Sequence, residues 1–240
     1  MSKNLKIFLG ASYLFILFYF LYLIFTAVEI NRLDDFTYYK EIQSDLETYI
    51  STNTIINLIY FFIFSVIWVT LLGFGSPILI ISGILFGQII GTLISVFSIS
   101  IGALILYSIG NFFFRDLVKS ILEKKFNRYI ELFKKNEFFY FFIYRFIGGL
   151  GVPFGLQNLI PILFGMKKTN YFFASFFGFI PGFFIINTIG AGLNNYISKA
   201  DNFSMIDLIF TPEIYLPIVM FSILMFFSIV IKKKFFDDTN

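Results

Sequence analysis

Long apolar runs alternate with short charged segments along the whole chain. The apolar runs cover residues 7–28, 54–114, 138–166, 171–189 and 213–231. A helix needs about 20 apolar residues to cross the hydrocarbon of a bilayer, so the first run and the last two each predict one spanning helix. The second run carries no charge and has room for two spans, at 54–72 and 93–114. The pattern predicts an all-α polytopic membrane protein.

Residues 138–166 combine apolar character with features that a simple spanning helix does not need. A lone arginine, Arg145, lies in the run and is followed by two adjacent amides, Gln157 and Asn158. The residues that interrupt helices in this stretch are Gly148, Gly149, Gly151, Pro153, Pro161 and Gly165. Non-helical backbone at membrane depth is tolerated only where it is buried in protein or lines a wet cavity. We therefore expect a broken, re-entrant hairpin.

A similar break occurs earlier, at residues 73–77, and glycines then recur at four-residue steps through Gly91. Small residues at this spacing let another backbone approach closely. Packing within the chain is the more common use of such a stripe, and dimerisation is the alternative. The hinge positions expected here and in the run at 171–189 are Gly75, Pro77, Gly83, Gly87, Pro181 and Gly182. The two break regions make an inverted repeat of two hairpins the expected architecture.

Lysine and arginine mark the cytoplasmic ends of membrane helices, and they concentrate in three places. These are a basic amphipathic connector at residues 115–137, the pair Lys167 and Lys168, and the lysines at 232–234. Acidic side chains gather instead at residues 29–53 and around Asp201. The charges are consistent if both termini are cytoplasmic and the acidic segments are outside. With these segments on their assigned sides, the number of membrane crossings fits only if both break regions are hairpins.

Two segments near the N-terminus each allow two interpretations. Residues 7–28 form a longer run than the roughly 7–15 residues of a signal peptide and lack a small-residue cleavage site, so a retained anchor is favoured over a cleaved signal. In residues 29–53, apolar side chains recur at helical spacing at Tyr39, Ile42, Leu46 and Tyr49. That spacing is typical of an amphipathic helix on the bilayer surface, with a solvated loop as the alternative.

Composition narrows the function classes. Hydrophobic residues make up 58% of the 240 residues and aromatic residues 22%, which excludes an ordinary water-soluble domain. Because the chain has no cysteine and no histidine, it lacks thiolate ligands, imidazole ligands and the commonest general base. We expect no metal, no cofactor and no enzymatic activity. Abundant Phe, Ile, Lys and Asn with scarce Ala suggest an AT-rich genome and a bacterial inner membrane.

The basic connector could in principle bind nucleic acid, but acids are interspersed within it. They are Asp116, Glu123, Glu131 and Glu137. We therefore expect no nucleic-acid partner, and a headgroup-facing surface instead.

Arg145 is the main candidate for a binding residue. A guanidinium in hydrocarbon costs at least about 2.5 kcal/mol and usually faces a bundle interior or a water-filled cavity. It can direct two donors at a phosphate, which makes an anionic lipid headgroup the expected ligand. Snorkelling to the interface or holding the carbonyls of the broken hairpin is the alternative.

Other deep polar side chains are candidates for the same groove or for structural hydrogen bonds. Gln157 and Asn158 could donate to the headgroup or satisfy the carbonyls at the break. The remaining candidates are Gln88, Asn111 and Asn187. Because the spans contain no histidine, and no acid except Glu137 and Glu213 at their ends, transport is not expected to be driven by an intramembrane carboxylate.

The two break regions and the helices that follow them resemble the DedA superfamily, also called the SNARE-associated Golgi protein or VTT-domain family. The resemblance covers roughly residues 54–193. Its first motif comprises Gly75, Ser76 and Pro77, the SGILFG segment at 82–87, and Gly102 with Ala103. Its second motif comprises Arg145, Pro153, Phe154, Asn158, Leu159, Pro161, Gly165, Phe176, Gly178, Pro181, Gly182 and the GAGL segment at 190–193.

The resemblance implies two opposed re-entrant hairpins, each backed by a spanning helix, that move lipids between leaflets. Members are described as flippases of polyprenyl-phosphate carriers or as phospholipid scramblases. The chain departs from the family pattern in three respects: Gly148 replaces the first proline after the arginine, Asn111 replaces an arginine after Gly110, and residues 54–114 lack a carboxylate.

The expected organisation has three parts. Residues 1–53 form an anchor helix and an acidic external loop, residues 54–193 the membrane domain, and residues 194–240 an external loop, a last spanning helix and a basic cytoplasmic tail. The expected function is lipid transport, as a flippase or scramblase acting on anionic headgroups, and a homo-oligomer is possible. The alternatives are a small-ion or solute channel or transporter, and a non-transporting membrane organiser.

Overall fold

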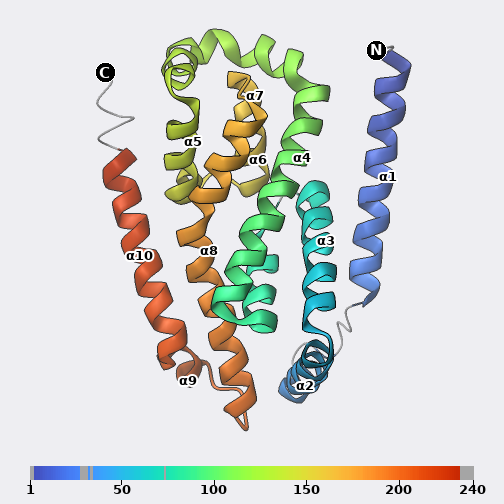
Figure 1. Ribbon diagram of the computed structural model, residues 1–240, viewed down its shortest axis with the longest axis vertical. Coiled ribbons are helices and arrows are strands. Elements are labelled where there is room, and N and C mark those ends of the chain that lie inside the picture. Colours follow the sequence, from blue (N-terminus) through green and yellow to red (C-terminus); the bar gives the residue numbers. More distant parts are fainter. Residues whose placement is uncertain (1–2, 28–31, 33–34, 73, 233–240) are drawn as a thin grey trace.

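The computed structural model describes residues 3–27, 32, 35–72 and 74–232, and the described part contains helices and no strands (Figure 1). The helices are α1 (Lys3–Ala27), α2 (Phe36–Thr52), α3 (Thr54–Leu72), α4 (Ser76–Lys135), α5 (Glu137–Phe146), α6 (Phe154–Leu159), α7 (Pro161–Phe164), α8 (Lys168–Lys199), α9 (Met205–Phe210) and α10 (Pro212–Lys232), with a 3-10 turn, η2 (Gly148–Gly151), between α5 and α6. The all-helical prediction is confirmed.

The chain reverses direction inside α4, at Gly87. This residue has φ +73° and ψ 179°, a conformation that is not helical and that glycine adopts far more readily than other residues. Residues on its two sides come back together: the hydroxyls of Ser82 and Ser95 lie 2.7 Å apart, and Gly75 lies against Ile99. In a continuous helix, residues 13 positions apart would be about 20 Å apart. Residues 76–86 and the helix after Gly87 are therefore antiparallel neighbours.

A second reversal connects α5 to α8. After α5, the backbone passes through three glycines with φ between +73° and +77°, at positions 148, 149 and 151. The short helices α6 and α7 then lead back to Gly165, which ends α7 with φ +62°. The return is fixed by packing on α4, where the Tyr107 hydroxyl donates to the carbonyl oxygen of Met166 at 2.7 Å. Where the starts of α5 and α8 meet, the Glu137 carboxylate accepts hydrogen bonds from the backbone N–H of Lys167 and from Asn170 Nδ2.

The same order of elements thus occurs twice. A helix (α3 or α5) is followed by a break, a short helical segment (residues 76–86 or 154–164), a glycine with positive φ (Gly87 or Gly165) and a long helix. The two series run in opposite directions, since α3 rises and α5 descends in Figure 1.

The core forms where α8 packs on α4. Gly83 and Gly190 allow this contact, because a Cβ at Gly83 would overlap the backbone carbonyl of Asn187 and one at Gly190 would overlap that of Ile80. Asn187 accepts a hydrogen bond from Ser82 and donates to the carbonyl oxygen of Phe183 at 2.8 Å. Gly83 and Gly91 of the glycine stripe therefore lie against α8 within the chain, whereas a Cβ at Gly87 would meet nothing within 4 Å.

The outer surface is apolar over most of the height of the molecule. Phe15 is 72% exposed and Ile55 75% exposed, as expected for side chains that face lipid. In the described part, three helical stretches are long and apolar enough to span a membrane: 54–71, Ser76–Asp116 and Lys168–Lys199. The second contains the reversal at Gly87, so its crossing portion begins after that residue. The protein is an integral membrane protein.

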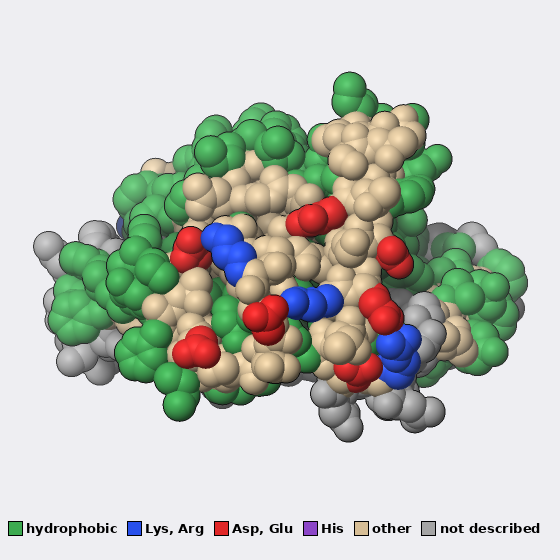
Figure 2. Space-filling model, turned by 90° about the horizontal axis from the view of Figure 1, so that it is seen from below, with side chains coloured by type: hydrophobic (Ala, Val, Ile, Leu, Met, Phe, Trp, Pro, Cys, Tyr) green, Lys and Arg blue, Asp and Glu red, His purple; other side chains and the backbone are tan. Residues whose placement is uncertain are grey.

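Charged side chains lie at the two ends of the molecule. The end of α1 that bears the N-terminus and the end of α10 that leads to the C-terminus lie on one side, and α2 lies on the opposite side (Figure 1). Figure 2 shows this opposite face, where acidic side chains outnumber basic ones. Lys134, Lys135, Lys167 and Lys168 flank the base of the second reversal, at the other end.

Three local expectations are resolved or corrected. The segment 29–53 contains a helix, α2, rather than only a loop. Residues 115–135 are helical and form the last part of α4, which leads to α5, and the side chains of 117–132 and the tail at 233–240 lie outside the described residues. Finally, α8 runs without interruption through Pro181 and Gly182, which corrects the expected break in the helix, while their hinge role stays a prediction.

Candidate functional site

Arg145 lies in the last turn of α5 and is almost completely buried, with 3% of its surface exposed. Its Nη1 donates to Gln157 Oε1 at 3.1 Å. Its Nη2 donates to Asn158 Oδ1 and to the Tyr171 hydroxyl, the latter at 3.0 Å. Tyr171 in turn donates to Asn158 Oδ1 at 3.1 Å. The short helix α6 and the first turns of α8 thus supply all these acceptors.

Aromatic rings enclose the guanidinium. Its Cζ lies 4.7 Å from the ring centroids of Phe141 and Phe179, 5.5 Å from Phe154 and 5.7 Å from Tyr171. Rings at these distances stabilise a cation through their quadrupoles. Among the described residues, no carboxylate lies within ion-pair distance of Arg145. The site therefore holds a positive charge that is solvated by neutral groups and is not neutralised.

Two buried donors in the cluster have no partner. Arg145 Nε and Asn158 Nδ2 are shielded from solvent and make no hydrogen bond. A buried donor without an acceptor costs free energy, and an explanation is required for each such group. Together with the uncompensated charge, they define a site that lacks an acceptor and lacks negative charge.

A cavity of ≈ 270 Å³ adjoins the cluster and connects it with the first break. Gly75 and Ser76 line it from the start of α4, Gly148 from the second break, and Arg145 and Gln157 from the charged cluster. At its edge, Phe146 and Phe221 are 39% and 40% exposed. The cavity therefore lies between the two chain breaks, with apolar side chains facing lipid at its margin.

The second break is shaped to hold Gln157. The Nε2 of Gln157 donates to the carbonyl oxygens of Val152, at 2.6 Å, and Gly148, at 3.3 Å, which leaves its Oε1 for Arg145. Gly149 makes room for this side chain, since its φ is +73° and a Cβ there would overlap the carboxamide of Gln157. Gln157 therefore links the non-helical backbone to the guanidinium.

The structure groups some of the sequence-predicted residues and separates others. It brings Arg145, Gln157 and Asn158 together, and Pro153 starts α6, which carries the two amides. Gln88 lines a different cavity, beside α10, and Asn111 shares no hydrogen bond with Arg145, although its buried Oδ1 is unpartnered. Sequence reasoning missed Tyr171 and Phe179.

The region that contains this site matches a family model. The model of the VTT domain matches residues 63–192, just over half of the chain. The chain belongs to the VTT-domain family. The matched region includes both breaks, every residue bonded to Arg145, and all residues that line the cavity between the breaks except Phe221. The VTT-domain family, also called the DedA or SNARE-associated Golgi protein family, is a family of membrane proteins of the transporter type. Neither curated proteins nor solved structures gave a match.

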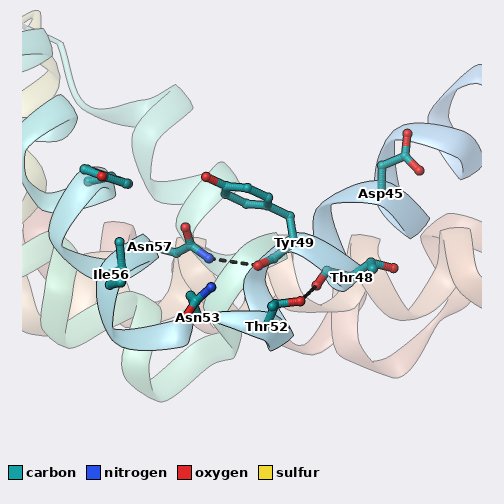
Figure 3. Close-up of a pocket in the computed structure, with 8 residues that line it drawn as sticks. Asp45, Thr48, Tyr49, Thr52, Asn53, Ile56 and Asn57 are labelled. Atoms are coloured by element: carbon teal, nitrogen blue, oxygen red, sulfur yellow. Dashed lines mark hydrogen bonds between the residues drawn. The ribbon is translucent and has the colours of Figure 1, made fainter.

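A second polar cavity of this VTT-domain protein lies where α2 meets α3 (Figure 3). Asn57 Nδ2 donates to the carbonyl oxygen of Tyr49 at 2.9 Å and joins the two helices. Asp45 is the one carboxylate that lines this cavity, and in the part of the chain described, no group of three potential metal ligands occurs. The contacts at this cavity are those of a helix junction.

Proposed function

We propose that this protein moves lipids with anionic headgroups between the leaflets of a membrane and that Arg145 binds the headgroup. The observation that carries the proposal is a guanidinium that is buried, has an unpartnered Nε and, among the described residues, contacts no carboxylate. Intramembrane charges usually serve a substrate path. Charge-assisted hydrogen bonds from a guanidinium to a phosphate are short and strong, and here they would supply both the missing acceptor and the missing negative charge.

The two chain breaks would form the path along which the lipid headgroup crosses the membrane. We interpret each reversal as a re-entrant hairpin that enters and leaves on its own side of the membrane, and the two together as an inverted repeat. In repeat-built transporters, substrate sites lie at the interface of such broken segments. The cavity of ≈ 270 Å³ between the breaks is below the 300–1,000 Å³ typical of pockets that enclose a whole ligand. It suits a headgroup whose tails stay in the bilayer, past Phe146 and Phe221.

Movement through this route needs no proton. No histidine is present, and none of the described residues that line the cavity beside Arg145 is a carboxylate. Since no group there titrates near neutral pH, we expect passive scrambling, or flipping limited by binding. The protein would act in a bacterial inner membrane with both termini in the cytoplasm.

A dithionite-quench assay on the purified protein in vesicles tests the proposal. Fluorescent anionic and zwitterionic lipids are compared for wild type, Arg145→Ala and Arg145→Lys, with and without a pH gradient. Hydrogen bonds to a charged group contribute about 1.5–3 kcal/mol, so the alanine variant should slow anionic lipids at least about tenfold. Lysine keeps the charge but loses the planar fork, so an intermediate rate is expected.

Other outcomes point to different functions. If the folded wild type moves no lipid but conducts or takes up inorganic phosphate or chloride, the same cationic site serves a channel or solute transporter. If it moves nothing and Arg145→Ala alters only stability, Arg145 has a structural role in a membrane organiser. A strict requirement for a pH gradient would contradict the passive mechanism.

A further inference from the structure

A separate cavity of ≈ 480 Å³ lies on the face of the molecule formed by α2 and α9, opposite the termini. Its wall comes from four elements. The main lining residues are Phe36 of α2, Ile84 of α4, Leu193 and Tyr196 of α8, and Leu208 of α9. The volume is within the 300–1,000 Å³ range of ligand pockets, which are mostly lined by hydrophobic and aromatic side chains.

The wall offers an occupant little except apolar surface. The hydroxyl of Tyr196 both donates to the carbonyl oxygen of Ser204, at 2.9 Å, and accepts from the Ser204 N–H, at 2.8 Å. Its ring, together with those of Phe36 and Phe203, forms an aromatic cluster with centroids 6.0 to 6.5 Å apart. Water gains few hydrogen bonds in such a site, and an empty apolar cavity costs stability. An apolar ligand is therefore favoured.

The surroundings indicate where that ligand comes from. On α9, Leu208 faces the cavity while Ile206 and Phe210 are 69% and 74% exposed. Residues at the margin of the cavity, Phe203 and Tyr39, are themselves 53% and 38% exposed. Exposed apolar side chains grouped in this way mark an interaction site, and for an integral membrane protein the acyl chains of the bilayer are the apolar partner at hand.

We propose that this cavity binds an acyl chain of a membrane lipid from the leaflet on the α2 side. The headgroup would remain at the charged rim, where Lys40 Nζ lies 5.9 Å from the ring of Phe36. Through Ile84, three residues before Gly87, the bound chain would support the tip of the first reversal. This site is separate from the Arg145 cluster and does not depend on lipid transport.

Photolabelling tests the site directly. The full-length protein is reconstituted with phosphatidylcholine that carries a diazirine in its acyl chain, irradiated and digested, and labelled peptides are mapped. The matched variants are Leu208→Trp, which fills the cavity, and Ile206→Trp, which places the same side chain on the exposed face of α9. A second filling variant, Ile84→Phe, acts from another wall if Leu208→Trp does not fold.

Wild type should be labelled at residues 193–197, and an excess of unlabelled phospholipid should suppress this labelling. Leu208→Trp should reduce it about tenfold, equivalent to about 1.4 kcal/mol of binding free energy, while Ile206→Trp leaves it unchanged. The proposal is overturned if residues 193–197 are not labelled, if unlabelled lipid does not compete, or if both tryptophan variants behave alike. Since the readout is labelling, failure here is distinct from failure of the transport proposal.

Discussion

The charged cluster depends on one residue that carries no functional group, Gly178. An ideal Cβ at this position would lie 2.5 Å from Arg145 Cβ and 3.0 Å from the carbonyl oxygen of Phe142. The first distance is shorter than real Cβ contacts, and the second is tighter than most of them, so a side chain at residue 178 would force α8 and α5 apart. We expect Gly178→Ala to destabilise the protein by about 1–3 kcal/mol, the usual range for overpacking. Thermal unfolding of the purified protein in one detergent measures the effect.

Gly182 supplies the control, because it lies one turn later on the same helix and borders the same cavity. A Cβ there would meet nothing within 4 Å, and alanine in a helix interior is favoured over glycine by roughly 0.5–1 kcal/mol. Gly182→Ala should therefore be neutral or stabilising. Equal losses in the two variants would show that the contact between Gly178 and Arg145 is not the cause.

The sequence alone could identify about half of the residues that form the charged cluster. Arg145, Gln157 and Asn158 lie within one apolar stretch, and their polarity marks them there. Tyr171 and Gly178 belong to the next long helix, and only the packing of α5 on α8 brings them to the guanidinium. The hydroxyl of a tyrosine and the absence of a side chain carry no signal of that contact. Conversely, Gln88 is polar, as expected for a residue of the site, but it lines a different cavity.

At the scale of elements, glycine and proline located the breaks but not the course of the helices. Gly87 and Gly165 both adopt positive φ where the chain turns. Pro181 lies at a position expected to interrupt α8, yet the helix continues through it. Neighbouring helices can satisfy the carbonyl freed by a proline in a membrane helix. A proline alone therefore cannot distinguish a hinge from a continuous helix.

The prediction at this scale concerns the contact between the first reversal and α8. A Cβ at Gly83 would overlap the main-chain carbonyl of Asn187, and backbone cannot move aside as a flexible side chain can. Gly83→Ala should separate the helices and weaken the hydrogen bond between Ser82 and Asn187, which is worth about 0.6–1.7 kcal/mol in a membrane protein. We expect a larger loss of stability than for Gly178→Ala, measured in the same way.

Ile81→Ala is the comparison, since Ile81 lies two residues away and is 40% exposed, and it should have a small effect. The oligomeric state of each variant, from light scattering, separates the two uses of a glycine stripe. If Gly83→Ala kept its stability but changed its mass in solution, the stripe would serve contacts between copies of the chain.

For the whole molecule, the distribution of charge predicts the orientation in the membrane. The two ends of the described chain lie on one side of the molecule, together with the helix ends that carry Lys134, Lys135, Lys167 and Lys168. Helix α2 and its acidic residues lie on the other side (Figures 1 and 2). Lysine and arginine in short loops favour the cytoplasmic side, while acidic residues contribute little. We therefore predict that the side with Lys134, Lys135, Lys167 and Lys168 faces the cytoplasm.

The absence of cysteine from the chain allows this orientation to be measured with single substitutions. Ser51→Cys places a thiol at the exposed end of α2, and Lys135→Cys places one at the exposed end of α4. A membrane-impermeant maleimide should label Ser51→Cys in intact bacterial cells but Lys135→Cys only after permeabilisation. The reverse pattern would invert the orientation and leave the fold intact. Labelling of both thiols in intact cells would mean that α3 and α4 do not carry the chain across the bilayer, which would contradict the two-hairpin arrangement itself.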